Sequence, residues 1–184
     1  MRKFTAAAVA LSTAALTLGL AGPANAELYG VDDPEDTFHG SDIRAVKIRN
    51  GVDNLTVRTF HNGLRPAPAT GSAGRIYVDT NRKDAGPEYV FVGGFTRGTD
   101  YLLRRTEGFR VGSWGKSVAH GDYIMRVAYK KDRVTFRMSR AALGRPGAVR
   151  VSVVASGNRT DGTSKGLVDW VGPRRSFTPW IAKG

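Results

Sequence analysis

The chain has 184 residues with 28 lysines and arginines, 16 aspartates and glutamates, a formal net charge of +12 and no cysteine. The absence of cysteine excludes disulfide cross-links, thiol catalysis and attachment through a lipidated cysteine. The positive charge favours anionic partners such as acidic glycans, teichoic acids, nucleic acids or phospholipid headgroups, but scattered arginines are also typical of an ordinary solvated surface.

Residues 1–26 are predicted to be a Sec-type signal peptide. They contain basic residues at 2–3, an apolar stretch over 6–20 and the small residues Ala-Asn-Ala at 24–26, which is the usual order of such a peptide. The apolar stretch is shorter than a membrane-spanning helix requires, and no later stretch is longer. We therefore expect a secreted, extracellular protein without a membrane span, whose mature chain begins at Glu27.

The remaining chain divides by composition into three parts. An acidic N-terminal segment covers 27–41, a β-sandwich domain is predicted over 42–170, and a C-terminal tail covers 171–184. The tail is rich in aromatic residues but lacks the alternation of a strand. The length of the chain after residue 26 and its lack of cysteine fit a single domain held by one apolar core.

Beyond residue 40, apolar and polar residues alternate, and turn residues separate the segments at short intervals. In residues 133–138, Val134, Phe136 and Met138 share one face, as expected of a half-buried antiparallel strand. We predict an all-β fold, namely an antiparallel two-sheet β-sandwich of jelly-roll or immunoglobulin-like type, with about nine strands and one short helical turn near 139–144. The predicted strands span 43–49, 54–61, 75–79, 88–93, 100–105, 109–114, 122–129, 133–138 and 148–156.

The stretch YVDTNRKDAGPEY places oxygen-bearing side chains at a corner between two predicted strands. Asp79, Asn81, Asp84 and Glu88 offer the oxygens that calcium prefers. Asp42 would join them if the N-terminal segment folds across the same end of the sandwich. The spacing is not that of an EF-hand, and Asp and Asn are common at turns because they bond the local backbone. We interpret the stretch as an Asx-rich turn, with Ca²⁺ as the candidate cofactor.

Aromatic residues supply a second candidate site. Trp114, Tyr123, Trp170, Phe177 and Trp180 could form a flat surface on which sugar rings stack. A tryptophan near a chain end more often seals the open end of a core, because its large apolar area is unfavourable in water. The lack of alternation in the tail favours the seal.

Outward-facing arginines supply a third candidate. Arg126 and Arg137 are assigned to a ligand-binding surface, and Arg58 shares a strand face with Phe60. Cations interleaved with aromatic rings also suit single-stranded nucleic acid. The predicted export signal argues against that role, so no specific nucleic-acid partner is expected.

Enzymatic activity has weak support in the sequence. The Gly-Ser-Trp-Gly stretch at 112–115 lacks the first glycine of a nucleophile elbow, and the widely spaced histidines do not suit zinc. Glu88 or Glu107 could pair with an aspartate as a glycosidase dyad. We expect that the protein is not an enzyme. The alternative is a polysaccharide hydrolase or lyase that uses strand-end carboxylates.

Four stretches carry a family resemblance: SDIRAVKIRN, LTVRT, IYVDTN with GPEY, and VTFRMSRAALGRPGAVRVSVVA. Together they resemble small exported actinobacterial β-sandwich proteins, which are similar to family-nine carbohydrate-binding modules and DOMON-type domains. The resemblance implies two packed antiparallel sheets and a surface for sugar, haem or calcium. The resulting hypothesis is a secreted, non-enzymatic binding module for a glycan or an anionic cell-envelope polymer. A purely structural role stays open.

Overall fold

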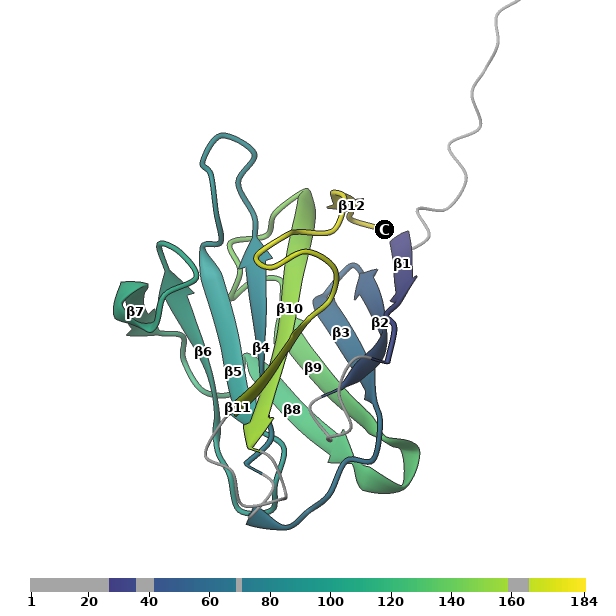
Figure 1. Ribbon diagram of the computed structural model, residues 1–184. Helices are drawn as coiled ribbons and strands as arrows, with labels where there is room; N and C mark the ends of the chain where they lie inside the picture. Colours follow the sequence, from purple (N-terminus) through teal and green to yellow (C-terminus); the bar gives the residue numbers. More distant parts are fainter. Residues whose placement is uncertain (1–26, 36–41, 69–70, 159–165) are drawn as a thin grey trace, which may run out of the picture.

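Two antiparallel sheets pack face to face in the computed structural model, which describes residues 27–35, 42–68, 71–158 and 166–184 (Figure 1). The predicted signal peptide lies outside these residues. The five-stranded sheet has the order β1 (Glu27–Asp32), β2 (Ile43–Asn50), β3 (Asn54–His61), β9 (Arg133–Ser139) and β8 (Tyr123–Ala128). The seven-stranded sheet has the order β11 (Gly166–Trp170), β10 (Ala148–Asn158), β4 (Ala73–Asp79), β5 (Tyr89–Gly94), β6 (Tyr101–Thr106) and β7 (Trp114–Ser117), with β12 (Ile181–Ala182) paired to β10.

The chain crosses between the sheets after β3, after β7 and after β9. Short connections join β2 to β3 and β8 to β9. The β2–β3 hairpin closes where the Gly51 N–H donates to the Asn54 carbonyl at 3.0 Å, and the β8–β9 hairpin contains a short 3-10 turn, Tyr129–Lys131. The all-β two-sheet sandwich predicted from the sequence is confirmed, and the described residues form twelve strands in place of about nine.

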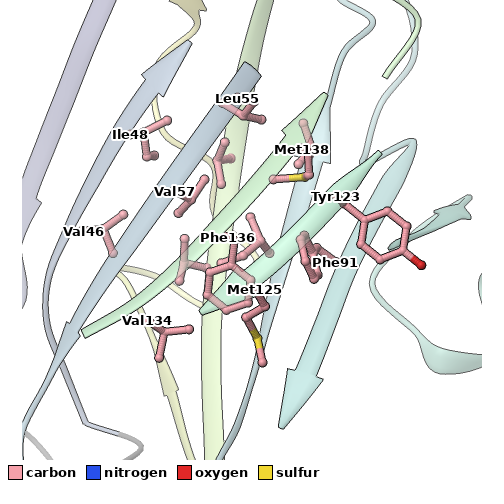
Figure 2. Packing of buried hydrophobic residues seen from close by; sticks show 14 of the residues in the cluster. Val46, Ile48, Leu55, Val57, Phe91, Tyr123, Met125, Val134, Phe136 and Met138 are labelled. Atoms are coloured by element: carbon pink, nitrogen blue, oxygen red, sulfur yellow. The ribbon is translucent and has the colours of Figure 1, made fainter. Parts of the chain in front are cut away.

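The apolar layer between the sheets follows directly from the alternation in the strands. Val134, Phe136 and Met138 of β9 are completely buried, and the outward residues between them are partly or fully exposed. Figure 2 shows these side chains together with Val46 and Ile48 of β2 on the side of the sheet that faces the second sheet. Burying large apolar side chains is the main favourable contribution to the stability of such a fold.

Four strands were missing from the sequence prediction, namely β1, β7, β11 and β12, and of these β1 and β12 lie in the flanking segments. β1 runs along β2 and directs Tyr29 and Val31 toward the core, so the N-terminal segment begins as an edge strand. The β11 strand pairs with β10. These strands are short or lie at sheet edges, where few apolar residues mark the pattern.

The two-residue strand β12 closes the seam between the sheets. It pairs with β10, and Ile181 is buried in the main core. The Asn50 side chain of β2 donates to the Ile181 carbonyl at 2.9 Å, and the Gly184 N–H donates back to the Asn50 carbonyl at 3.0 Å. The Ala182 N–H donates to the Glu27 carboxylate of β1. The tail therefore bonds to both sheets.

The strand predicted over 109–114 is wrong. Residues Val111–Ser113 form a 3-10 turn, and β7 begins only at Trp114. The Phe109 carbonyl accepts a hydrogen bond from the Tyr77 hydroxyl at 2.9 Å, and its ring packs on Tyr77. Packing of one aromatic ring against the sheet thus overrides the local alternation.

The helical turn predicted near 139–144 is a hydrogen-bonded turn. The Ala142 N–H donates to the Ser139 hydroxyl at 3.2 Å, and Gly144 ends the turn with a φ of +77°. A positive φ favours glycine because it has no Cβ. In the portion of the chain that is described, no helix has the length and apolar character to cross a membrane.

Candidate functional site

The outer side of the five-stranded sheet carries a group of cations. In its strands, alternate side chains point away from the core, and five of these outward positions on β2, β3, β8 and β9 carry exposed basic residues. We call this set the basic face, and it consists of Lys47, Arg49, Arg58, Arg126 and Arg137. Arg126 and Arg137, both predicted from the sequence as ligand-binding residues, therefore lie on one surface.

Strand register arranges the basic face in two rows that run across the strands. The first row is Lys47, Arg58, Thr135 and Arg126, and the second row is Arg49, Thr56, Arg137 and Ile124. Neighbouring strands lie about 4.8 Å apart, so each row spans about 14 Å. Cations thus recur along the rows at spacings that a chain of repeating anionic groups can match.

All residues of the two rows except Lys47 line an open groove with a volume of about 540 Å³. The small threonine side chains lie between the long arginines, which leaves the groove floor accessible. Its acidic residue, Asp53, lies in the β2–β3 hairpin at one end. The lining consists of Arg49, Gly51, Val52, Asp53, Asn54, Thr56, Arg58, Ile124, Arg126, Thr135 and Arg137.

The electrostatics of the basic face are unfavourable for the isolated protein. Lys47 and Arg58 lie directly opposite each other on β2 and β3, and like charges in that position destabilise a sheet. The Lys47 ammonium lies over the Phe60 ring, 5.7 Å from its centroid. Within the described ranges, both ion pairs lie elsewhere, so no carboxylate neutralises the basic face. Such a surface suits an anionic ligand.

The five predicted aromatic residues do not share one surface. Tyr123 lies at the edge of the main core and contacts Phe91 at a centroid distance of 5.4 Å. Trp114, Trp170 and Phe177 belong to a second apolar cluster on the outer side of the seven-stranded sheet. The arrangement of these three favours the seal over the sugar platform.

That second cluster is built around Tyr77 of β4. Phe109 packs on the Tyr77 ring at 4.7 Å, and Trp170 stacks parallel to it at 6.4 Å. Tyr77 is 1% exposed, and burial raises the pKa of its hydroxyl against smaller effects from nearby arginines such as Arg75. In Figure 1 the yellow C-terminal segment passes in front of β10 on this side of the sandwich. We call this surface the covered face.

Trp180 has a separate environment next to the predicted calcium loop. The guanidinium of Arg150 lies 5.0 Å from the Trp180 ring centroid and 4.6 Å from that of Phe177. Arg82 approaches the Trp180 ring at 4.6 Å. These cation–π contacts attach the tail to β10 and to the loop between β4 and β5.

The oxygens of the predicted calcium loop are bonded within the chain. Asp79 is completely buried, and its Oδ2 accepts hydrogen bonds from Arg150 Nε at 2.7 Å and Nη2 at 2.6 Å. Its Oδ1 accepts from the Asn81 N–H at 3.0 Å. The Asn81 side chain donates to Asp84, and Glu88 Oε2 accepts from the Thr80 N–H at 2.6 Å. These contacts are those of an Asx-rich turn.

Asp42 does not join this loop. Asp42 directly precedes Ile43, whose N–H donates to Asp169, and Asp169 lies opposite Ala155 of β10. Asp79 lies opposite Arg150 of the same strand. Five residues of a strand separate these levels by about 17 Å. The described part of the chain contains no group of three or more His, Asp or Glu side chains arranged to hold a metal ion.

The sequence analysis missed Lys47 as a member of the basic face, and Arg49, Thr56 and Thr135 as lining residues of the groove. Alternation showed that such residues point outward, but it did not show that β3 pairs with β9 and β2 with β3 in this register. No family model matches the chain, and no curated protein matches it.

Proposed function

We propose that the protein is a non-enzymatic binding module that holds an anionic polymer on its basic face after export. An acidic glycan or another charged cell-envelope polymer is the partner class. The observation that carries the proposal is the pair of cross-strand rows, which gathers five cations around an open groove with no carboxylate partner among the described residues.

The charge arrangement supports binding over a purely structural role. Opposed Lys47 and Arg58 reduce the stability of the free protein, and an anionic ligand would remove that repulsion. A flexible polymer that contacts several cations releases its own counterions, so its affinity falls as salt rises. The groove is lined by residues of β2, β3, β9 and β8, so one linear ligand could contact several of these cations at once.

Charge reversal on the groove tests the proposal. The variant Arg58→Glu/Arg126→Glu/Arg137→Glu is compared with Arg97→Glu/Arg110→Glu/Arg174→Glu, which changes three exposed arginines elsewhere. Both variants have the same net charge. We expect the groove variant to lose at least about tenfold in affinity for heparin at low salt, since three charge contacts of about 0.5–1 kcal/mol each are removed and reversed.

The measurement is titration of heparin at several salt concentrations, with circular dichroism to confirm folding. The proposal predicts that the control variant loses no more than about threefold and keeps the salt dependence of the original protein. An equal loss in both variants would show that net charge alone attracts the polymer, and the proposal would be abandoned.

A further inference from the structure

A second cavity opens at the β8 end of the groove. It has a volume of about 250 Å³ and shares Asn54, Ile124 and Arg137 with the groove. We call it the ring pocket. Its lining consists of Asn54, Tyr101, His120, Gly121, Asp122, Tyr123, Ile124, Arg137 and Ser139. The cationic groove and this partly aromatic pocket are therefore adjacent.

Three rings form the aromatic wall of this pocket. The centroid of Tyr101 lies 6.0 Å from both His120 and Tyr123, and His120 lies 5.5 Å from Tyr123. Tyr123 is 5% exposed and rests on Phe91 of the core, so its position is fixed by packing. Figure 2 shows its hydroxyl directed away from the core residues.

The polar residues of the ring pocket differ in charge from those of the groove. Asp122 and Ser139 line the ring pocket and not the groove, whereas Asn54 and Arg137 line both. A carboxylate repels an anionic group, but it accepts hydrogen bonds from neutral hydroxyl groups. The pocket therefore suits the neutral hydroxyl groups of a unit whose charged group lies outside it.

The pocket fits a sugar ring better than a stacked nucleobase. Tyr123 exposes little of its ring, and the Tyr101 and Tyr123 planes meet at 78°, so they offer a corner and not a parallel platform for base stacking. Apolar ring faces with polar groups at their edges match a pyranose, which has CH faces and hydroxyl edges.

We infer that the ring pocket binds a neutral portion of a sugar ring while the acidic groups of the same polymer contact the basic face. The ligand class is then an acidic polysaccharide, whose rings carry neutral hydroxyl groups, as distinct from a polyphosphate, which has no ring and no such hydroxyl groups along its chain, or from single-stranded DNA. This inference rests on the proposed function, because it assumes that the basic face holds the charged part of the chain.

The test compares three polymers with similar numbers of charges: polygalacturonate, inorganic polyphosphate and single-stranded oligothymidine. Their affinities are measured by isothermal titration calorimetry with the original protein and with His120→Ala/Asp122→Ala. The matched control is Glu107→Ala, which removes an exposed carboxylate that does not line either cavity.

We expect the double variant to bind polygalacturonate about tenfold more weakly, because the bound sugar loses the His120 ring and the Asp122 carboxylate as contacts. The same variant should bind polyphosphate equally well or slightly more tightly, because a repelling carboxylate has been removed. The control should bind all three polymers as the original protein does.

The outcomes separate the two proposals. If the original protein binds none of the polymers, the proposed function fails and the ring pocket fails with it. If it binds them but the double variant changes polygalacturonate and polyphosphate affinity in the same direction and amount, the basic face stands and the ring pocket is rejected. A selective loss of oligothymidine binding would also reject it, in favour of a base-stacking site.

Discussion

The two outer faces of the sandwich carry opposite kinds of surface on similar strands. On the covered face, the outward side chains of β4, β5 and β10 include Tyr77, Val90 and Val154, which are buried under Phe109 and Trp170. On the basic face, the outward positions of β2, β3, β8 and β9 carry exposed cations without such a cover.

The difference shows how one sandwich separates stability from recognition. The covered face adds a second apolar layer, and aromatic burial is among the larger contributions to stability. The basic face contributes little apolar burial and includes an opposed pair of like charges. Residues on the covered face should therefore matter for folding, and residues on the basic face for binding.

The largest expected effect is on the covered face. Replacing Tyr77 by alanine removes the centre of the aromatic cluster and should lower the free energy of unfolding by about 3–5 kcal/mol. Ile124→Ala, at a partly buried outward position beside the basic face, should cost less than about 1 kcal/mol. Urea denaturation of both variants measures the contrast, and equal losses would contradict the division between the faces.

A second prediction concerns the inner side of β3, opposite to Arg58. His61 is 5% exposed, its Nε2 lies 2.7 Å from the Thr59 hydroxyl oxygen, and its ring packs on Phe95 at 5.1 Å. Burial lowers the pKa of His61 from 6.5 to about 4, against a smaller raising effect of Asp42. The folded protein therefore keeps the neutral ring where the unfolded chain takes up a proton.

Stability should consequently decrease as the pH falls from 6.5 to about 4 and then lose nothing more through this residue. The loss that His61 causes is about 3 kcal/mol, since one pKa unit corresponds to about 1.4 kcal/mol. Subtracting the unfolding free energies of His61→Gln from those of the original protein across this range isolates the effect.

The smallest effects come from single arginines, compared between the faces. Arg150→Ala leaves the fully buried Asp79 without its ion pair and should cost about 2 kcal/mol, less than for a fully enclosed pair because Arg150 is partly exposed. Arg58→Ala should change stability by less than about 0.5 kcal/mol, and in the stabilising direction, since it relieves repulsion with Lys47. Thermal unfolding at low salt measures the stability of both variants. A loss above 1 kcal/mol for Arg58→Ala would contradict the inference that Arg58 adds no stability to the free protein.

The sequence predicted the strands with regular alternation far better than the strands fixed by packing. The strand over 54–61 has the predicted bounds, and 133–138 differs from β9 by one residue. Apolar and polar residues alternate through 133–138, and they alternate from Leu55 to Arg58 before Thr59 takes an inward position. The strand over 109–114 failed because the contact of Phe109 with Tyr77 involves a residue far away in the sequence.

The candidate site was predictable only in part, for the same reason. Arg126 and Arg137 were identified as outward cations, but their proximity to Lys47 and Arg49 depends on which strands are neighbours. Alternation specifies the direction of a side chain and not its partners across the sheet. The aromatic residues were harder still, because the tail and Phe109 decide which of them are covered.

The bonds of β12 to both sheets have a kinetic consequence. Its contacts join parts of the chain that are separated by 155 residues between Glu27 and Ala182, and by 131 between Asn50 and Ile181. Because distant segments must meet before they gain stabilising contacts, β-rich proteins of this kind fold in about milliseconds to seconds. We therefore expect the contacts of β12 to form late in folding. Unfolding should begin where β12 holds the two sheets together.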